Sequence, residues 1–174
     1  KDAYPLENVK GGIEFKNVTY SYEGGKEVLD NISFKIAPGE TFALVGPSGG
    51  GKTTVCHLIP RFYNINQGEI LIDGNNVVDV TMESLRDKIG IVQQDIYLFN
   101  ASVKENILYG RPTATDEEVI NAAKRANIHD YILTLPEGYD TVIGERGVRL
   151  SGGQKQRLSI ARVFLKDPDR KSVV

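Results

Sequence analysis

The chain has one cysteine, no long apolar run and almost no excess of either charge. Because Cys56 is alone among 174 residues, no disulfide can form within the chain, which fits a reducing compartment. The longest apolar runs span a few residues, as at 42–45, far below the roughly 18 that a membrane span needs. A net charge of -2 with interspersed signs forms no basic stripe, which argues against a nucleic-acid partner or a polybasic membrane anchor.

Signals for secretion and for metal binding are also missing. Residues 1–12 are charged and polar, contain no signal peptide, and lack periodicity, so they are expected to be a linker that enters a domain beginning at Ile13. Two histidines and one cysteine make no metal-ligand set. We expect His57 to pack within a helix and His129 to lie at a polar helix start, and assign neither a function.

Alternating residues predict two antiparallel strands near the start of the chain. Residues 13–22 alternate between apolar and polar at period two, and residues 31–36 do the same with Ile32, Phe34 and Ile36 on one face. These two segments are expected to form an N-terminal antiparallel β part.

Other apolar stretches predict further strands. Residues 41–46, TFALVG, form a continuous apolar run of the kind that is buried on both faces of a parallel sheet. Residues 69–74 and 88–92 are also predicted strands.

The second half of the chain has helical signals instead. A Ser or Thr is followed three residues later by Glu or Gln at Ser102 with Glu105, Thr115 with Glu118, and Ser151 with Gln154. Such pairs can satisfy free backbone N–H groups at a helix start. They predict helices near 102–109, 115–126, 128–134 and 151–166. The fold class is therefore α/β.

A glycine-rich stretch, GPSGGGKT at 46–53, matches the pattern G-x-x-x-x-G-K-[ST] of a phosphate-binding loop. It follows a predicted buried strand and precedes an apolar stretch of helical length, which is the context that the motif requires. Glycines let successive N–H groups converge on a phosphate at a helix start. Lys52 would reach the β and γ phosphates and the Thr53 hydroxyl would bind Mg²⁺. The residues assigned to ATP here are Gly46, Pro47, Ser48, Gly49, Gly50, Gly51, Lys52, Thr53 and Thr54. The alternative is a glycine-rich turn that happens to contain Lys-Thr.

A second anion site is predicted at LSGGQ, formed by Leu150, Ser151, Gly152, Gly153 and Gln154. Ser151 can cap the helix, but a cap alone explains neither glycine, because both lower helix propensity. Together with the phosphate loop, LSGGQ resembles the signature of the ATP-binding cassette (ABC) family over about residues 13–168. The resemblance implies a P-loop NTPase fold with a helical subdomain at approximately 95–160, and cofactors ATP and Mg²⁺.

The resemblance also implies how the two anion sites work. Two such domains, identical or different, pack head to tail, and ATP lies between the phosphate loop of one and the signature of the other. Tyr22 stands where the family places a ring on adenine, with Tyr20 as the rival. Gln94 aligns with the glutamine that senses Mg²⁺ and the γ-phosphate, with Gln93 as the alternative.

Further positions resemble the part of exporters that meets a transmembrane partner. Residues 96–99 (Ile96, Tyr97, Leu98, Phe99) are apolar for a loop, with plain core packing as the alternative. The segment DTVIGERG at 140–147 resembles the exporter segment that contacts the membrane domain, and Glu145 and Arg146 match its pattern. The alternative is that these two residues form only a surface ion pair. Val142 departs from the exporter pattern, since many exporters have Glu there.

Residues expected after the signature helix are absent from these 174 residues. No apolar strand ending in Asp-Glu follows Pro168, so the resemblance implies that the C-terminal strands, the catalytic Glu and a Mg²⁺ ligand are missing. Residues 169–174, DRKSVV, can be encoded by a nucleotide sequence that resembles a sequencing-library adapter. We therefore expect them to be a non-native tail. The alternative is a natural short ending of the protein.

The leading interpretation is therefore an ATPase domain of an ABC exporter at the cytoplasmic face of a cell membrane. Residues 1–12 would then connect to an absent transmembrane domain, whose coupling helices the domain contacts. The alternatives are a soluble ABC ATPase acting on DNA or ribosomes, and a binding module without turnover. The transported substrate is not encoded in this stretch.

Overall fold

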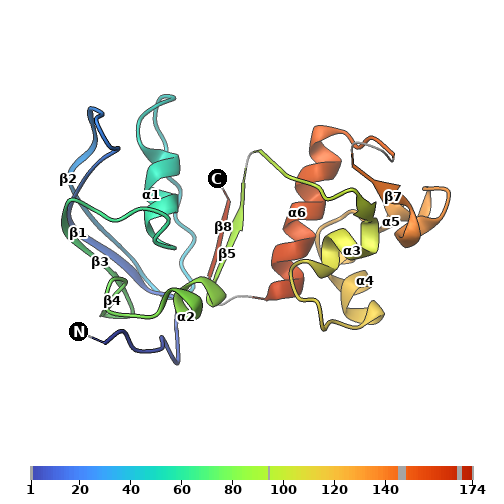
Figure 1. Cartoon of the computed structure of the whole chain (residues 1–174), viewed down its shortest axis with the longest axis horizontal. Helices are drawn as coiled ribbons and strands as arrows, with labels where there is room; N and C mark the ends of the chain where they lie inside the picture. Colours follow the sequence, from blue (N-terminus) through green and yellow to red (C-terminus); the bar gives the residue numbers. More distant parts are fainter. Residues whose placement is uncertain (1, 94, 145–147, 168–169, 174) are drawn as a thin grey trace. The chain divides into compact units, whose positions relative to one another are not determined.

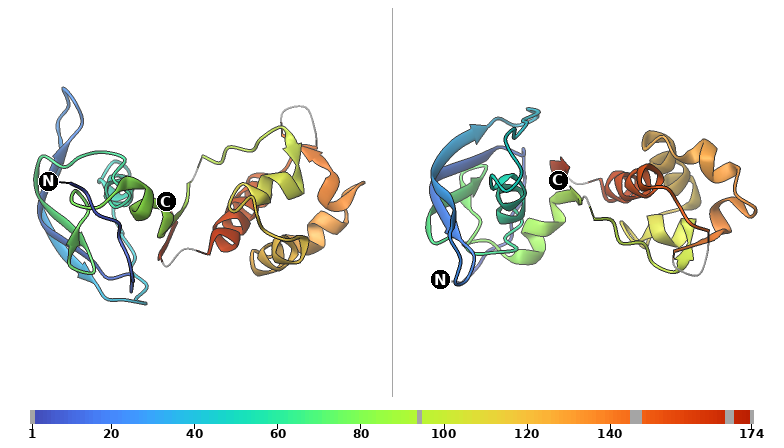
Figure 2. Two further views of the ribbon diagram at one scale, coloured as in Figure 1. Left: turned by 60° about the horizontal axis from the view of Figure 1, so that its bottom comes forward. Right: turned by 90° about the horizontal axis from the view of Figure 1, so that it is seen from above.

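The computed structural model describes residues 2–93, 95–144, 148–167 and 170–173. The chain divides into two compact units, Lys1–Ile89 and Gly90–Val173. Figures 1 and 2 show the elements of each unit, with the strands of the first in blue to green and the helices of the second in yellow to red. In the described residues no helix is long and apolar enough to cross a membrane.

The first unit contains a four-stranded antiparallel sheet in the order β2-β1-β3-β4. Its strands are β1 (Ile13–Ser21), β2 (Glu27–Ile36), β3 (Gln67–Ile72) and β4 (Asn75–Asn76). Phe15 faces Phe34 across the β1–β2 pair, and the two rings stack at 4.5 Å between centroids. Ile32, Phe34 and Ile36 lie on the more buried face of β2, as the alternation predicts.

An irregularity in β1 interrupts the alternation without moving the apolar residues off the core side. The register shifts between Phe15 and Val18, and Asn17 takes a positive φ of 49°. The Asn17 amide donates to the Asn31 side-chain oxygen at 2.9 Å. Because the strand absorbs one extra residue at the bulge, Val18 and Tyr20 are buried on the same side as Phe15.

Residues 4–12 are fixed to the first unit, although the sequence predicts order only from Ile13. Tyr4 forms a parallel bridge with Val80, and Leu6 is buried. The Asp73 carboxylate accepts hydrogen bonds from the backbone N–H groups of Lys10, Gly11 and Gly12 at 2.6 to 3.0 Å. A single carboxylate therefore ties the segment to the turn after β3.

The predicted strand at 41–46 is wrong. In the part of the chain that the structure describes, residues 41–46 have no ladder partner and no strand assignment, and Val45 is 92% exposed. A run that is apolar on both sides forms a strand only where neighbouring strands pair with its edges and cover its faces. The Phe42 ring is partly covered by the sheet, because it stacks on the Phe34 ring of β2 with 5.3 Å between the centroids.

Two short helices complete the first unit. α1 (Lys52–Leu58) follows the glycine-rich loop, and α2 (Met82–Asp87) follows β4. Arg86 of α2 donates from Nε to the Pro60 carbonyl at 3.1 Å and from Nη2 to the Arg61 carbonyl at 3.0 Å. The guanidinium thereby satisfies carbonyl groups just beyond the end of α1.

The helices of the second unit are α3 (Val103–Leu108), α4 (Asp116–Arg125), α5 (His129–Leu133) and α6 (Gly152–Lys166), with a 3₁₀ turn η1 at Gly138–Asp140. The helices α3, α4 and α6 begin where their capping signals stand, whereas α5 begins after Ile128 without a side-chain cap. The capping boxes of Ser102, Thr115 and Ser151 are all formed, which confirms these predictions. Buried residues of α3, α4 and α6 make one apolar core, in which Ile107, Ala123 and Ala161 are fully enclosed.

Two small sheets flank these helices. β6 (Ala101–Ser102) pairs with β7 (Val142–Ile143), and β5 (Ile89–Val92), a predicted strand, pairs with β8 (Arg170–Val173). Residues 170–173, which were expected to be a non-native tail, thus form a strand that pairs with β5.

Candidate functional site

The glycine-rich loop at 46–50 is exposed and turns tightly before α1. The Gly50 N–H donates to the Pro47 carbonyl at 3.2 Å, which closes the turn. All five residues from Gly46 to Gly50 are exposed. Their backbone is therefore open to a ligand, as a phosphate loop requires.

Gly51 ends the loop in a conformation that few other residues could take. Its φ is 78°, and a Cβ added there would lie 2.7 Å from Leu29 Cδ2 and 3.2 Å from the Val28 carbonyl oxygen. The absence of a side chain lets the start of α1 approach β2 closely. The contact with β2 thus fixes where α1 begins relative to the glycine-rich loop.

The Lys52 ammonium lies over its own loop. It donates to the carbonyl oxygens of Gly46 at 2.9 Å and of Pro47 at 2.7 Å. These two carbonyls hold the cation at the mouth of the loop, where it can reach an anion bound by the backbone. The neighbouring Thr53 is exposed and Thr54 is buried.

Tyr22 and Tyr20 differ sharply in exposure. Tyr22 is 39% exposed and its hydroxyl shares a hydrogen bond with Thr54 Oγ1 at 3.0 Å, whereas Tyr20 is only 4% exposed. Burial, followed by the charges that Tyr22, Tyr63 and Glu23 would carry, raises the pKa of Tyr20. Of the two rings, only that of Tyr22 offers area for a ligand to stack on.

The LSGGQ segment forms the start of α6. Ser151 Oγ accepts from the Gln154 N–H at 3.3 Å, and Gln154 Oε1 accepts from the Ser151 N–H at 2.7 Å. Leu150 is buried in the core of the second unit and anchors the segment. The remaining N–H groups of the first turn point out of the helix end, where an anion is favoured.

Gly152 and Gly153 have no packing reason to be glycine. Both are exposed, and a Cβ built on either would meet nothing within 4 Å in the part of the chain that the structure describes. Gly152 and Lys155 line a pocket of about 410 Å³ together with residues 95–97. Lys155, which directly follows LSGGQ, and Asp95 were not predicted as site residues. The open surface at the glycines is compatible with close approach of a ligand or a second chain.

Arg162 of α6 holds the loop that follows position 94. It donates from Nη1 to the Tyr97 carbonyl at 2.8 Å, from Nε to the Asn106 carbonyl at 2.7 Å, and from Nη2 to Asn106 Oδ1 at 2.6 Å. Burial lowers the pKa of Arg162. Asn106 is completely buried and also binds the backbone of Phe99, Ala101 and Ser102. No sequence motif predicts this network of hydrogen bonds.

The apolar residues at 96–99 are split between surface and core. Tyr97 is exposed, while Leu98 packs against the core of the second unit. Phe99 lies against the rings of Tyr97 and Tyr109. Core packing thus applies to Leu98, whereas contact of the exposed Tyr97 with a transmembrane partner stays a prediction.

Other predicted residues have simpler places. His57 is half-buried in α1 and His129 Nδ1 bonds the Tyr139 hydroxyl at 2.8 Å, where burial raises the pKa of Tyr139 to about 12. Gln93 is exposed. Gln94, Glu145 and Arg146 lie outside the described residues. Val142 is exposed in β7.

A family model described as ABC transporter matches residues 29–170, which is most of the chain and includes both glycine-rich segments. The chain belongs to the ABC transporter family. The fold class and the family resemblance drawn from the sequence are thereby confirmed.

Two curated bacterial relatives of this ABC transporter chain are closely similar. One, from Staphylococcus aureus (strain NCTC 8325 / PS 47), is named as a multidrug export ATP-binding/permease protein and is 59% identical over 167 residues. YgaD of Bacillus subtilis (strain 168), also named so, is 55% identical over 168 residues. The matches cover 95% and 96% of this chain but 29% of each relative.

Among solved structures, a bacterial Atm1-family ABC exporter with ATP bound is similar to this chain with a TM-score of 0.91 and 45% identity. The match covers 99% of this chain and 31% of the exporter chain. This ABC transporter chain thus spans less than a third of the length of the relatives that it matches.

Proposed function

We propose that this chain is the ATP-binding domain of an ABC exporter, which couples binding and hydrolysis of ATP to export of a substrate across a membrane. The observation that carries the proposal is the pairing, in one chain, of an exposed phosphate loop with a capped, open signature segment. The relatives are named as combined ATP-binding/permease proteins, which favours an exporter over a soluble ATPase.

The residues of the first unit fit MgATP. The loop N–H groups and Lys52 would hold the phosphates, and Tyr22 offers the exposed ring for the adenine. The family resemblance implies that Mg²⁺ would be held by the phosphates, by the Thr53 hydroxyl, which is exposed, and by Gln94 of the second unit. A bound Mg²⁺ would neutralise charge on the phosphate oxygens.

The signature segment would act on the nucleotide of a second domain. Ser151, Gly152 and Gly153 present an anion-favouring helix end, and a Cβ at either glycine would meet no atom of the described residues within 4 Å. We propose a head-to-tail dimer, identical or mixed, with further contact to the coupling helices of a transmembrane domain at the cytoplasmic face. Because the 174 residues contain no strand ending in Asp-Glu after α6, we propose that this chain binds ATP but hydrolyses it poorly.

The test is equilibrium binding of MgATP to the 174-residue chain, followed by measurement of phosphate release. We expect binding that the Lys52→Ala variant weakens at least tenfold, and phosphate release near background until the next segment of an exporter relative is added. Equal MgATP binding by the parent chain and the Lys52→Ala variant would overturn the assignment of the phosphate loop.

A further inference from the structure

Three tyrosine rings meet beside the start of α1, and Tyr22 is the exposed ring that the proposed adenine site uses. Tyr22 lies edge-on to Tyr20, with centroids 5.0 Å apart and planes at 81°, and edge-on to Tyr63, with centroids 5.3 Å apart and planes at 86°. Tyr20 and Tyr63 are 5.9 Å apart. The Tyr22 ring is therefore braced from two sides.

Perpendicular contacts of this kind are attractive because a ring edge is positive and a ring face negative. They also restrict the rotation of a side chain that would otherwise turn freely at the surface. The Tyr22 hydroxyl is fixed as well, through its hydrogen bond to Thr54. A ring held in this way can accept a base without a further loss of rotamer freedom.

Tyr20 and Tyr63, the two rings that contact Tyr22, differ in their contribution to folding. Tyr20 is buried in the sheet, so its removal would damage the core. Tyr63 is 43% exposed and comes from the segment that follows α1. Its contribution to Tyr22 can therefore be separated from its contribution to folding.

We infer that Tyr63 is a positioning residue of the nucleobase subsite, which holds the Tyr22 ring in the orientation that stacks on the base. Tyr63 would thereby link the base subsite to α1, the helix that carries the phosphate-binding residues. This inference rests on the proposed function, since it assumes that Tyr22 receives the base.

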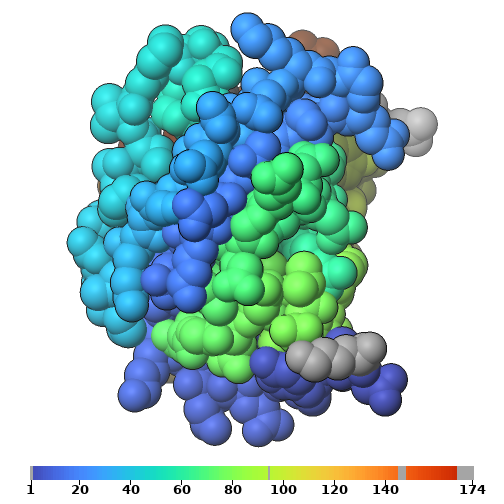
Figure 3. Space-filling view, turned by 90° about the vertical axis from the view of Figure 1, so that its left-hand side faces the viewer, coloured from blue at the N-terminus to red at the C-terminus, as the bar shows by residue number. Residues whose placement is uncertain are grey.

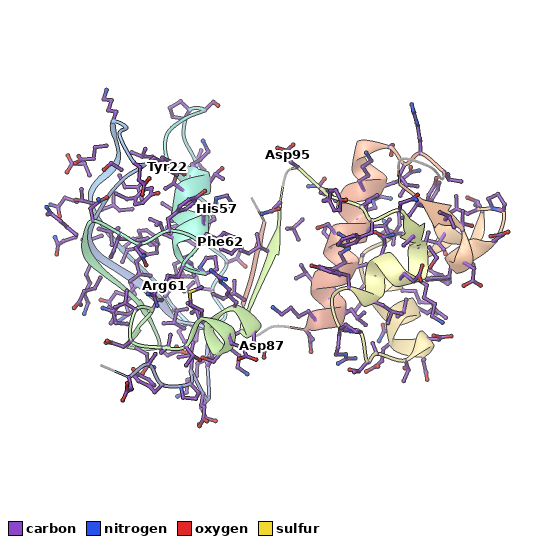
Figure 4. All side chains as sticks on the ribbon, in the orientation of Figure 1. Tyr22, His57, Arg61, Phe62, Asp87 and Asp95 are labelled. Carbon is purple, nitrogen blue, oxygen red and sulfur yellow. The ribbon has the colours of Figure 1, made fainter. Side chains whose placement is uncertain are left out.

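Phe62 provides a matched control. It is the neighbouring residue, it is aromatic, and it is also 43% exposed. Its ring contacts His57 at 5.6 Å between centroids and the Arg86 guanidinium at 5.3 Å. The Tyr63 ring also lies 6.4 Å from His57, but of the two it is Tyr63 that contacts Tyr22. Figure 4 shows Tyr22 near the start of α1 and Phe62 beyond its other end.

The experiment measures dissociation constants of the 174-residue chain for MgATP and for magnesium tripolyphosphate, which has no base. The ratio of the two constants within one variant reports base recognition, because a loss of folded molecules weakens both apparent constants equally. We expect Tyr63→Leu to lower the preference for ATP about 3- to 10-fold. Tyr63→Phe should restore it, and Phe62→Leu should leave it unchanged.

The outcomes separate the inference from the proposed function. A wild-type chain that is folded by circular dichroism yet binds neither ligand would overturn both. A wild-type chain that binds tripolyphosphate as tightly as ATP would leave the phosphate loop in place but overturn the base subsite and the role of Tyr63. An unchanged ratio in Tyr63→Leu, or an equal fall in Phe62→Leu, would overturn the positioning role alone.

Discussion

At Gly51 the local backbone and the neighbouring strand impose the same requirement. A positive φ costs a non-glycine residue roughly 1–2 kcal/mol, and an added Cβ would also press on Leu29 of β2. The glycine pattern of the phosphate loop is thus partly a packing requirement of the sheet. The ligand is not its sole cause.

A substitution at this position tests that reasoning. We expect Gly51→Ala to lower the free energy of unfolding by about 1–3 kcal/mol, from the strained φ and the contact with Leu29. Gly46→Ala is the control, because a Cβ there meets nothing within 4 Å and its φ is not positive. Urea unfolding followed by circular dichroism measures both; equal losses would contradict the packing argument.

At the scale of the element, three helices begin with the same capping geometry but different chemistry. Glu105 and Glu118 complete the boxes of α3 and α4, whereas the amide of Gln154 completes that of α6. Hydrogen bonds from the backbone N–H of Ser102 lower the pKa of Glu105, and those from Thr115 do the same for Glu118. Two of the three caps can therefore titrate.

The sign of the effect follows from those directions. A carboxylate with a lowered pKa stabilises the fold above its ordinary pKa of 4.5, and this stabilisation is lost as the pH falls through the lowered value. We expect the amide NMR signals of Ser102 and Thr115 to shift with midpoints below 4.5 on acidification. The Ser151 amide, which donates to Gln154, should not follow such a curve, and a matching midpoint there would contradict the assignment.

Hydrogen bonds from one side chain of α6 also hold this helix to residues 97–106. Arg162 donates three hydrogen bonds to Tyr97 and Asn106, and Asn106 is fully buried. Because removal of a donor leaves buried acceptors unpaired, we expect Arg162→Ala to cost about 2–4 kcal/mol of unfolding free energy.

Arg157 supplies the control on the same helix. It is exposed and donates to the Asn127 carbonyl at 3.2 Å, so Arg157→Ala should cost less than about 1 kcal/mol. Chemical denaturation of both variants measures the difference. Similar losses would show that the Arg162 network contributes little beyond a surface contact.

At the scale of the whole molecule, the apolar segment 41–45 is left open. Phe42, Leu44 and Val45 are all exposed. Figure 3 shows the sky-blue to cyan stretch of the first unit that contains this segment along the left edge of the view. Unpaired backbone and exposed apolar side chains on one segment promote association between chains.

We therefore expect the 174-residue chain expressed alone to be poorly soluble or weakly stable. Extending it with the following segment of one of its longer relatives should raise the midpoint of thermal unfolding and the fraction of monomer, because added strands can pair with 41–45. Light scattering and calorimetry measure both. A sharp, reversible thermal transition of the 174-residue chain well above ambient temperature would contradict this expectation.

Local signals in the sequence were sufficient for most of the elements. The capping pairs predicted the starts of α3, α4 and α6, and the alternation of apolar and polar residues predicted β1 and β2. Both signals depend only on residues that are close together in the sequence. α2 and the two-residue strands β4, β6 and β7 were missed, since they are too short to show a period. The strand at 41–46 was wrong because its existence depends on partners, which no local pattern supplies.

For the candidate site, the sequence determined the family and the two glycine-rich segments that are proposed to bind anions, because these depend on residue types at fixed spacing. Only the tertiary structure separated Tyr22 from Tyr20, since exposure depends on how the whole sheet packs. It alone brought Tyr63 to the edge of Tyr22 and Arg162 to Asn106, contacts between residues that are 41 and 56 positions apart. Such long-range contacts form only when the core is assembled, and they decide how the residues named by the motifs are held in place.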